Sequence, residues 1–179
     1  DLDHVDLYSC FPSAVQVAAR EYGFSDDRDL TVTGGLTFGG GPLNNYVMHS
    51  IARTVELLRE SGGHGLVTAN GGNLYKHVHG IYAKQPPAAD FAVDNVQERI
   101  EGLSARVCIA EHTGTAEIES YTVMFGAQGP QIAHLACLTP DGERTWVNSE
   151  DADLLQTMTE EEFCGRQVQL HASELSALA

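Results

Sequence analysis

Three groups of residues in this 179-residue chain have types and spacings that could carry chemistry. The most prominent is the loop Gly34–Pro42, GGLTFGGGP, in which five of nine positions are glycine. Glycine gathers in this way where the backbone bends sharply or lies close to a ligand. Backbone N–H groups at Gly39, Gly40 and Gly41 could bind an acyl or phosphate oxygen without help from a side chain. The alternative is a purely structural turn between a strand and a helix.

This loop matches neither of the two common phosphate-binding motifs. No Lys-Ser or Lys-Thr pair follows its glycines, as a P-loop requires, and the GxGxxG order of a dinucleotide fingerprint is absent. Any ligand that the loop holds is therefore bound in another way.

A cysteine and a histidine pair are the other candidates. Cys10 lies near a predicted helix start, where the helix dipole favours a nucleophilic thiolate; the alternative is simple packing. His77 and His79 share one face of a predicted strand, as a metal pair would. No third ligand accompanies them, so we expect polar strand residues near a cleft and no metal site. Lys76, beside them, could meet the phosphates of a ligand.

Alternating strand and helix signals position these groups within residues 1–85. Strands are predicted at 4–10, 30–35, 63–72 and 73–83, and helices at 11–24 and 42–61. Pro12 and Gly23 mark the start and end of the first helix, and Pro42 marks the start of the second. The pattern indicates an α/β layer with a largely buried sheet.

A second domain follows a predicted linker at residues 86–98, which begins with two prolines. In residues 99–179 the apolar period changes to two. Strands are predicted at 105–114, 115–126, 131–142, 143–150 and 165–172, with one helix at 149–163 entered through Ser149. Short antiparallel strands in this number favour a small β-barrel of OB-like kind, with Trp146 in its core.

Charge and composition exclude several function classes. Lys and Arg number six against nine acids in residues 1–88, but four against 16 in residues 89–179, so nucleic acid and acidic membranes would be repelled. No apolar run approaches the roughly 20 residues of a membrane helix, and the start resembles no signal peptide. Four cysteines without metal-type spacing indicate reduced thiols and a cytoplasmic protein. The absence of an initial Met suggests a fragment or a processed chain.

Three stretches, in chain order, resemble the active-site loops of the C-terminal half of thiolases. They are Tyr8–Phe11 (YSCF), Gly34–Pro42 and Asn70–Gly72 (NGG). In that family the first loop reads Asn-Glu-Ala-Phe or His-Asp-Cys-Phe, the second reads Gly-Gly-x4-Gly-His-Pro, and the third carries a Cys followed shortly by glycines. With its added β domain, the chain is similar to thiolase-like proteins of type 1, which are acetyl-CoA acetyltransferase-like. The resemblance implies a layered α/β part of a thiolase C-terminal half over residues 1–85, followed by the small antiparallel barrel.

The resemblance also implies that the catalytic side chains of this half are replaced. The His that activates the nucleophile corresponds to Gly41, and glycine has no side chain that could move a proton. The Asn or His of the first loop corresponds to Tyr8, and a phenol is a poor base. The acid/base Cys of the third loop falls near Asn70, whereas Cys10 matches a non-catalytic position. The acyl-accepting Cys of thiolases belongs to their N-terminal half, outside this chain.

We therefore expect the C-terminal portion of a thiolase-like, acyl-CoA-binding protein of lipid metabolism, with its thiolase activity lost or altered. Coenzyme A would be bound only as part of an acyl-CoA ligand, near Gly39–Gly41 and Lys76. The macromolecular partner would be the N-terminal thiolase half, a partner subunit or a second copy, because residues 1–85 supply about four strands of a five-stranded thiolase sheet. The alternative is a non-enzymatic interaction module in which the acidic barrel docks a partner protein.

Overall fold

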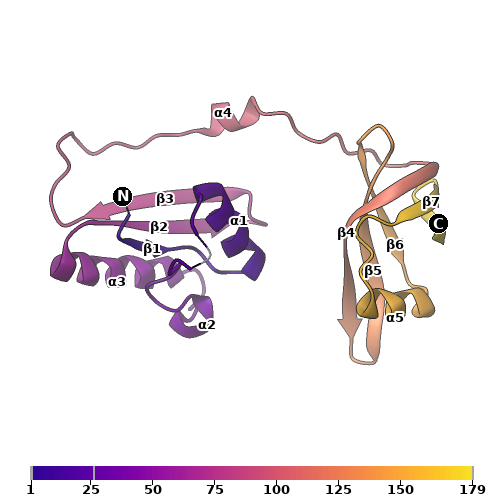
Figure 1. The fold of residues 1–179 in the computed structure, drawn as a ribbon, viewed down its shortest axis with the longest axis horizontal. Helices are drawn as coiled ribbons and strands as arrows, with labels where there is room; N and C mark the ends of the chain where they lie inside the picture. The colour runs from indigo at the N-terminus through magenta and orange to yellow at the C-terminus, as the bar shows by residue number, and fades with distance from the viewer. Residues whose placement is uncertain (1, 26, 179) are drawn as a thin grey trace. The chain divides into compact units, whose positions relative to one another are not determined.

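The computed structural model describes residues 2–25 and 27–178 of the chain. It has a mixed α/β fold with two sheets, one in each of two compact units, Asp1–Val93 and Asp94–Ala179 (Figure 1). None of the helices in the described part is long and apolar enough to cross a membrane.

The first unit is a three-stranded sheet with a helix on each face. Strand β1 (His4–Asp6) pairs in parallel with β2 (His64–Gly71), which pairs antiparallel with β3 (Lys76–Ala83). Helix α1 (Pro12–Tyr22) packs on the face that carries three buried side chains: Val5 of β1, Leu66 of β2, and Leu7, which directly follows β1. Successive strand residues point to opposite faces, so Asp6 faces the other helix, α3 (Tyr46–Ser61).

The strand predicted at residues 30–35 is wrong. Val32 and Thr33 form a bend, the rest of residues 30–35 has no regular structure, and the segment carries no ladder to β1 or β2. Thr31, Val32 and Thr33 instead donate hydrogen bonds to the carboxylate of Asp6. A carboxylate at the end of β1 therefore takes the Val32 N–H, a backbone donor that a neighbouring strand would have used.

The helix predicted from Pro42 begins later in the structure. A short helix, α2 (Leu36–Gly39), precedes it, and α3 starts at Tyr46. Leu43 has φ 53°, a left-handed conformation that no regular right-handed helix contains, so residues 42–45 form a turn. The glycine loop is thus followed by a turn at residues 42–45, which contains no glycine.

Strand β3 is an exposed edge of the first sheet. Val78 and Ile81 point to opposite faces of it, yet 68% and 61% of their surfaces are exposed. Within the described chain both side chains thus stay largely uncovered, although Tyr22 of α1 reaches His79 on the same strand. Residues 84–96 form neither helix nor strand, and the short helix α4 (Gln97–Glu101) follows them.

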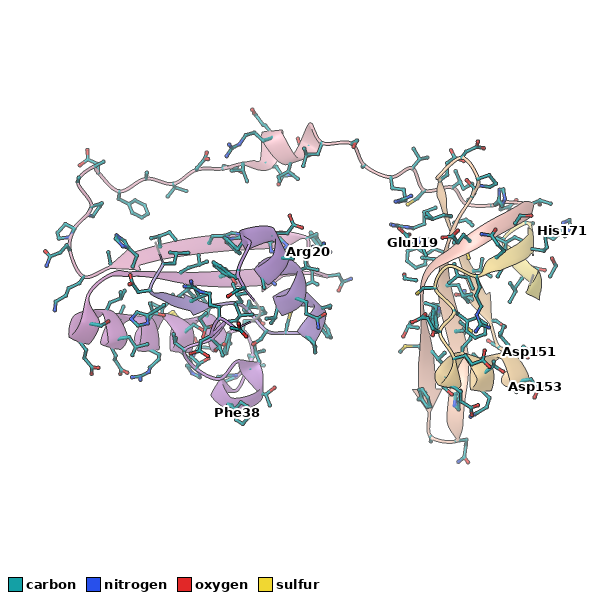
Figure 2. The ribbon with its side chains drawn as sticks, viewed as in Figure 1. Arg20, Phe38, Glu119, Asp151, Asp153 and His171 are labelled. Carbon is teal, nitrogen blue, oxygen red and sulfur yellow. The ribbon has the colours of Figure 1, made fainter. Side chains whose placement is uncertain are left out.

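The second unit is a five-stranded antiparallel sheet with one helix packed on it. The sheet order is β6-β5-β4-β7-β8, and the strands are β4 (Gly114–Gly126), β5 (Gly129–Leu138), β6 (Arg144–Ser149), β7 (Gln167–His171) and β8 (Glu174–Leu178). Helix α5 (Ala152–Glu160) covers the inner face, and Phe163, Leu155 and Met158 complete the core there. The cap of α5 is Asp151, which accepts from the Leu154 N–H at 2.8 Å, and not the predicted Ser149 (Figure 2 labels Asp151 and Asp153).

No closed barrel is found. In the described residues, β6 and β8 are the two ends of the sheet order and no ladder joins them. The strand predicted at 105–114 forms only an isolated parallel bridge, Cys108 to Arg144. Trp146 is not core: its neighbours on β6, Thr145 and Val147, take the inner face, so Trp146 points outward with 59% of its surface exposed.

Candidate functional site

The three loops singled out in the sequence meet the sheet where its parallel strands end. Strand β1 ends at Asp6, directly before Tyr8–Phe11, and Asn70 lies next to the end of β2. Because β1 and β2 run parallel, these two ends lie at one edge of the sheet, where open α/β sheets bind their ligands. The Tyr8 N–H donates to the Thr68 hydroxyl at 2.9 Å and joins the first loop to β2.

A buried carboxylate organises this edge. Asp6 is fully buried, and its two oxygens accept five hydrogen bonds. The donors are the Thr31 and Thr33 hydroxyls at 2.8 and 3.1 Å, the Val32 N–H at 3.0 Å, the Tyr46 hydroxyl at 2.8 Å and the Ser50 hydroxyl at 2.6 Å. Burial of a charge is tolerated only when its oxygens are satisfied in this way. Asp6 therefore ties the segment that leads into the glycine loop to both β1 and α3.

The first loop and the glycine loop are joined through Ser9. The Leu36 N–H donates to the Ser9 hydroxyl at 2.9 Å. At Gly35, φ is +77°, and a Cβ there would lie 2.8 Å from that same hydroxyl. Only glycine fits this close approach without moving Ser9. The role of Ser9 could not be inferred from the sequence, because nothing in the chain order links it to Leu36, 27 residues away.

The glycine N–H groups are partly used by the loop itself. The Gly39 N–H donates to the Gly35 carbonyl at 2.7 Å, and the Gly40 N–H donates to the Leu36 carbonyl at 3.1 Å. Of the three predicted oxygen-binding N–H groups, Gly41 alone has no hydrogen-bond acceptor among the described residues. Phe38 projects from this loop with 83% of its surface exposed (Figure 2). The loop is thus rigid at its base and apolar at its tip.

Asn70 and His77 face each other across the β2–β3 hairpin. The His77 Nδ1 lies 2.9 Å from the Asn70 Oδ1, and its Nε2 lies 2.6 Å from the Leu74 carbonyl oxygen. Both ring nitrogens are therefore engaged, which leaves His77 without a free lone pair for a metal. The arrangement also places an imidazole beside the position of the third thiolase loop.

His79 shares the face of His77 but has a different partner. Its Nδ1 is hydrogen-bonded to the Tyr22 hydroxyl of α1. Burial, with a smaller contribution from His77, lowers the pKa of His79, and burial raises the pKa of Tyr22. Both groups are thus neutral near pH 7. In the part of the chain that the structure describes, no three His, Cys, Asp or Glu side chains gather as a metal site would require.

Cys10, within the first loop, and Lys76, at the start of β3, take no part in the hydrogen bonds that join these loops. Cys10 is half-buried and reduced, and it makes no hydrogen bond to another side chain among the described residues. The Lys76 ammonium lies 5.5 Å from the centroid of the exposed Tyr75 ring. The structure therefore joins Tyr8, Ser9 and the glycine loop into one unit, and leaves Cys10 and Lys76 outside its hydrogen bonds.

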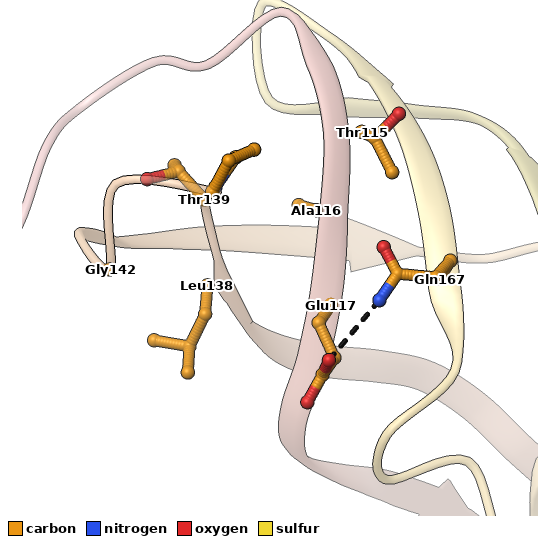
Figure 3. Close-up of a pocket in the computed structure, with 8 residues that line it drawn as sticks. Thr115, Ala116, Glu117, Leu138, Thr139, Gly142 and Gln167 are labelled. Atoms are coloured by element: carbon orange, nitrogen blue, oxygen red, sulfur yellow. Dashed lines mark hydrogen bonds between the residues drawn. The ribbon is translucent and has the colours of Figure 1, made fainter.

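Two cavities lie away from these loops. One of about 240 Å³ surrounds the start of β1, between Asp3, Asp29 and Leu57. The other, of about 340 Å³, lies in the second unit (Figure 3).

Comparison with known proteins identifies the family. The family model for the additional C-terminal domain of type 1 thiolase-like proteins matches residues 95–175. The fold is similar to the crystal structure of a monomeric SCP2-thiolase like protein type 1 from Mycobacterium smegmatis, with a TM-score of 0.83 and 34% sequence identity. That match covers 96% of this chain and 39% of the mycobacterial chain. No curated protein matches significantly. The resemblance found in the loops is thereby confirmed, and the chain belongs to the thiolase-like superfamily.

Proposed function

We propose that this chain is the C-terminal portion of a cytoplasmic, acyl-CoA-binding thiolase-like protein of lipid metabolism, with the thiolase reaction lost or altered. One observation carries the proposal: the buried Asp6 carboxylate and the Ser9 hydroxyl hold the glycine loop against the carboxyl end of β1. A loop held so firmly at its base is suited to present the Gly41 N–H to an acyl or phosphate oxygen. The match to a type 1 thiolase-like protein at 34% identity supports the thiolase-like part of the proposal.

The thiolase reaction would fail because the three catalytic positions of this half carry no side chain that transfers protons. By the resemblance to thiolases, Gly41 occupies the position of their catalytic His. Tyr8 corresponds to their Asn or His, and Asn70 lies near the position of their Cys. Two imidazoles lie near these positions: His77, both of whose nitrogens are engaged, and His49 of α3, whose Nδ1 lies 3.0 Å from the Gly39 carbonyl oxygen. Any remaining reaction would need one of these imidazoles or a group from outside this chain.

The proposed macromolecular partner is the N-terminal thiolase half, a partner subunit or a second copy. Strand β3 exposes Val78 and Ile81 on its two faces, and the glycine loop exposes Phe38. Open strand edges and exposed apolar side chains are typical of surfaces that pair with another part of a protein. This chain spans 39% of the length of the mycobacterial protein, which leaves room for such a part.

Purified chain is expected to show no thiolysis of acetoacetyl-CoA and no condensation of acetyl-CoA. The reason is the absence of a proton acceptor at Gly41, Tyr8 and Asn70 together with the absence of the acyl-accepting loop. A spectrophotometric assay of the enolate absorbance measures this directly. Turnover above the uncatalysed rate that is abolished by alkylation of Cys10 would contradict the prediction and would make Cys10 a nucleophile.

Weak binding of CoA, at most, is expected for the chain alone. The glycine loop supplies part of a cleft, whereas neither of the two cavities described above lies at the three loops. Calorimetric titration with CoA and with acetyl-CoA tests this, and Gly41→Pro, which removes the remaining N–H, should abolish whatever binding is seen. Submicromolar affinity would show that the site is complete within this chain.

A second candidate function concerns the second unit, which would dock a partner protein. Residues 94–179 contain 15 acidic and four basic residues. All four basic side chains form ion pairs with acids of the same unit: Arg99 with Asp94, Arg106 and Arg144 with Glu119, and Arg166 with Glu161. The remaining surface charge is negative, which favours a positively charged partner.

A further inference from the structure

One imidazole of the first unit has a fixed tautomer beside the glycine loop. The Nδ1 of His49, in the first turn of α3, lies 3.0 Å from the carbonyl oxygen of Gly39. A carbonyl oxygen can only accept a hydrogen bond, so Nδ1 must carry the proton of this one. In the neutral ring the other nitrogen, Nε2, then has a free lone pair. His49 is therefore a base whose proton-accepting atom is set by its bond to the loop.

The Nε2 atom of His49 is open to a ligand. Among the described residues it has no hydrogen-bond partner, and the ring forms no ion pair there. The side chain is only half-buried, so water reaches it. His77 differs, because both its ring nitrogens are engaged. Of these two imidazoles near the loops, His49 is the one that keeps a proton-accepting atom.

Packing holds His49 and the loop in a fixed relation. Tyr46 and Ser50 of the same helical turns donate to the buried Asp6 carboxylate at 2.8 and 2.6 Å. A Cβ at Gly39 would lie 3.2 Å from Cε2 of the Tyr46 ring, so the loop backbone lies directly against the start of α3. The imidazole is thus anchored through the same network that anchors the loop.

The loop also supplies an unbonded backbone donor two residues after Gly39. The Gly41 N–H has no acceptor among the described residues. Hydrolysis of an acyl group needs a base that takes a proton from water and a donor that stabilises the carbonyl oxygen as it becomes negative. Cys10 makes no hydrogen bond to another described side chain, so no base activates it as a nucleophile. Water is therefore the nucleophile that this arrangement favours.

We propose that His49 is the general base of this site and that the site hydrolyses acyl-CoA thioesters, an inference that rests on the acyl-CoA binding proposed above. The His49 Nε2 takes a proton from water while the water oxygen bonds to the thioester carbon, and the Gly41 N–H donates to the carbonyl oxygen. When the intermediate collapses, the C–S bond breaks and His49 returns the proton to the leaving sulfur. The products are a carboxylic acid and the coenzyme A thiol, so water is the only co-reactant.

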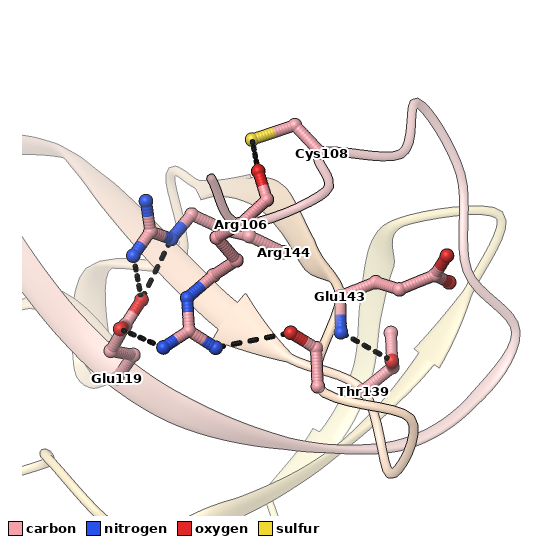
Figure 4. Close-up of polar contacts among 7 residues, drawn as sticks. Arg106, Cys108, Glu119, Thr139, Glu143 and Arg144 are labelled. Atoms are coloured by element: carbon pink, nitrogen blue, oxygen red, sulfur yellow. Dashed lines mark hydrogen bonds and ion pairs between the residues drawn. The ribbon is translucent and has the colours of Figure 1, made fainter. Parts of the chain in front are cut away.

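The second unit offers a matched comparison for His49. The half-buried His112 also faces a backbone carbonyl, with its Nε2 3.2 Å from the Thr115 oxygen. The guanidinium groups of Arg106 and Arg144 in that unit are both held by the Glu119 carboxylate (Figure 4). Because this unit does not contain the glycine loop, its imidazole should play no part in hydrolysis.

The test follows release of coenzyme A from acetyl-CoA by the 179-residue chain, by chromatography, with binding of acetyl-CoA measured by calorimetry. Release should exceed the uncatalysed rate. The amide of His49→Asn can still donate to Gly39 near the position of Nδ1, but it accepts no proton. This variant should therefore lower the rate by about 100-fold, or to the uncatalysed rate. His112→Gln keeps a donor for Thr115 in the same way and should leave the rate unaltered.

Nitrogen-15 NMR of the imidazoles provides a readout that does not depend on turnover. Above neutral pH the His49 ring should carry its proton on Nδ1 and none on Nε2, and its signals are assigned by their loss in His49→Asn. A proton on Nε2 would overturn the inference, because no lone pair would then be free there. The amide spectra of both variants ensure that folded proteins are compared.

The rate measurements distinguish failure of this inference from failure of the proposed function. Acetyl-CoA binding without hydrolysis, or an unchanged rate in His49→Asn, would remove the general base but leave the acyl-CoA site. Absence of both binding and hydrolysis in the unmodified chain would remove both. An equal loss in His49→Asn and His112→Gln would also overturn the inference, because the reaction would not then depend on the imidazole at the glycine loop.

Discussion

Replacing Asp6 with alanine is expected to unfold the first unit while the second stays folded, at a cost of about 4 kcal/mol or more. The substitution removes the acceptor of five hydrogen bonds in a fully buried place. Hydroxyl donors such as those of Tyr46 and Ser50 can turn toward other acceptors, but the Val32 N–H cannot, and a buried unsatisfied donor costs about 1–3 kcal/mol. The glycine loop would lose its anchor with the same change.

Native-state hydrogen exchange separates the two units in this experiment. Amides of β2 should lose protection in the Asp6→Ala variant, whereas amides of β5 should keep it. Asp6→Asn keeps one acceptor oxygen and the shape of the side chain. Its β2 amides should therefore have a protection between that of Asp6→Ala and that of the unmodified chain. Asp27→Ala, at an exposed turn, is the matched control and should change stability by less than about 0.5 kcal/mol. Unchanged protection of β2 without the Asp6 carboxylate would show that the network adds nothing to this unit.

Phe163→Ala should have the opposite effect and unfold the second unit alone, at a cost of about 3–5 kcal/mol. The Phe163 ring is fully buried in the core between α5 and the sheet. The Tyr121 ring meets it edge to face with centroids 5.9 Å apart, and the Arg166 guanidinium lies 4.1 Å from its centroid. Truncation therefore leaves a cavity and removes both contacts at once.

Phe125→Ala provides the matched control for this prediction, because Phe125 is an exposed aromatic side chain at the β4–β5 hairpin of the same unit. Thermal or urea denaturation, followed by exchange of the β5 amides, should show little change for Phe125→Ala and a large loss for Phe163→Ala. Equal effects of the two substitutions, or loss of protection in β2 together with β5, would contradict the independence of the two units.

Local sequence signals were sufficient where the structure depends on near neighbours. Pro12 and Gly23 delimit α1 as predicted, because each acts through its own backbone torsion. The alternating patterns of 63–72 and 73–83 became β2 and β3, and those of 115–126, 131–142 and 143–150 became β4, β5 and β6. The three loop motifs, read together in order, identified the superfamily that the comparisons confirm.

Tertiary structure alone decided the features that depend on partners far away in the chain. Residues 30–35 were predicted to enter the loop from a strand, but the Thr31 hydroxyl and the Val32 N–H donate to Asp6, some 25 positions earlier, and the segment carries no ladder. Antiparallel strands form a closed barrel only if the two edge strands of the sheet pair with each other. In the described residues the edge strands β6 and β8 share no ladder. Alternation along β6 showed that Trp146 differs from its neighbours, but not which of the two faces is the core.

The candidate site follows the same division. The sequence pointed to the glycine loop because glycines gather where the backbone has a positive φ or packs closely, as it does at Gly34 and Gly35. Asp6, an aspartate inside a predicted buried strand, was a further signal of the site, because a buried carboxylate needs several hydrogen-bond donors around it. Which donors those are, that Ser9 holds Leu36, and that His77 faces Asn70 could not be inferred from the sequence. Each of these contacts exists only because the sheet brings the ends of separate strands to one edge, and chain order carries no record of that distance.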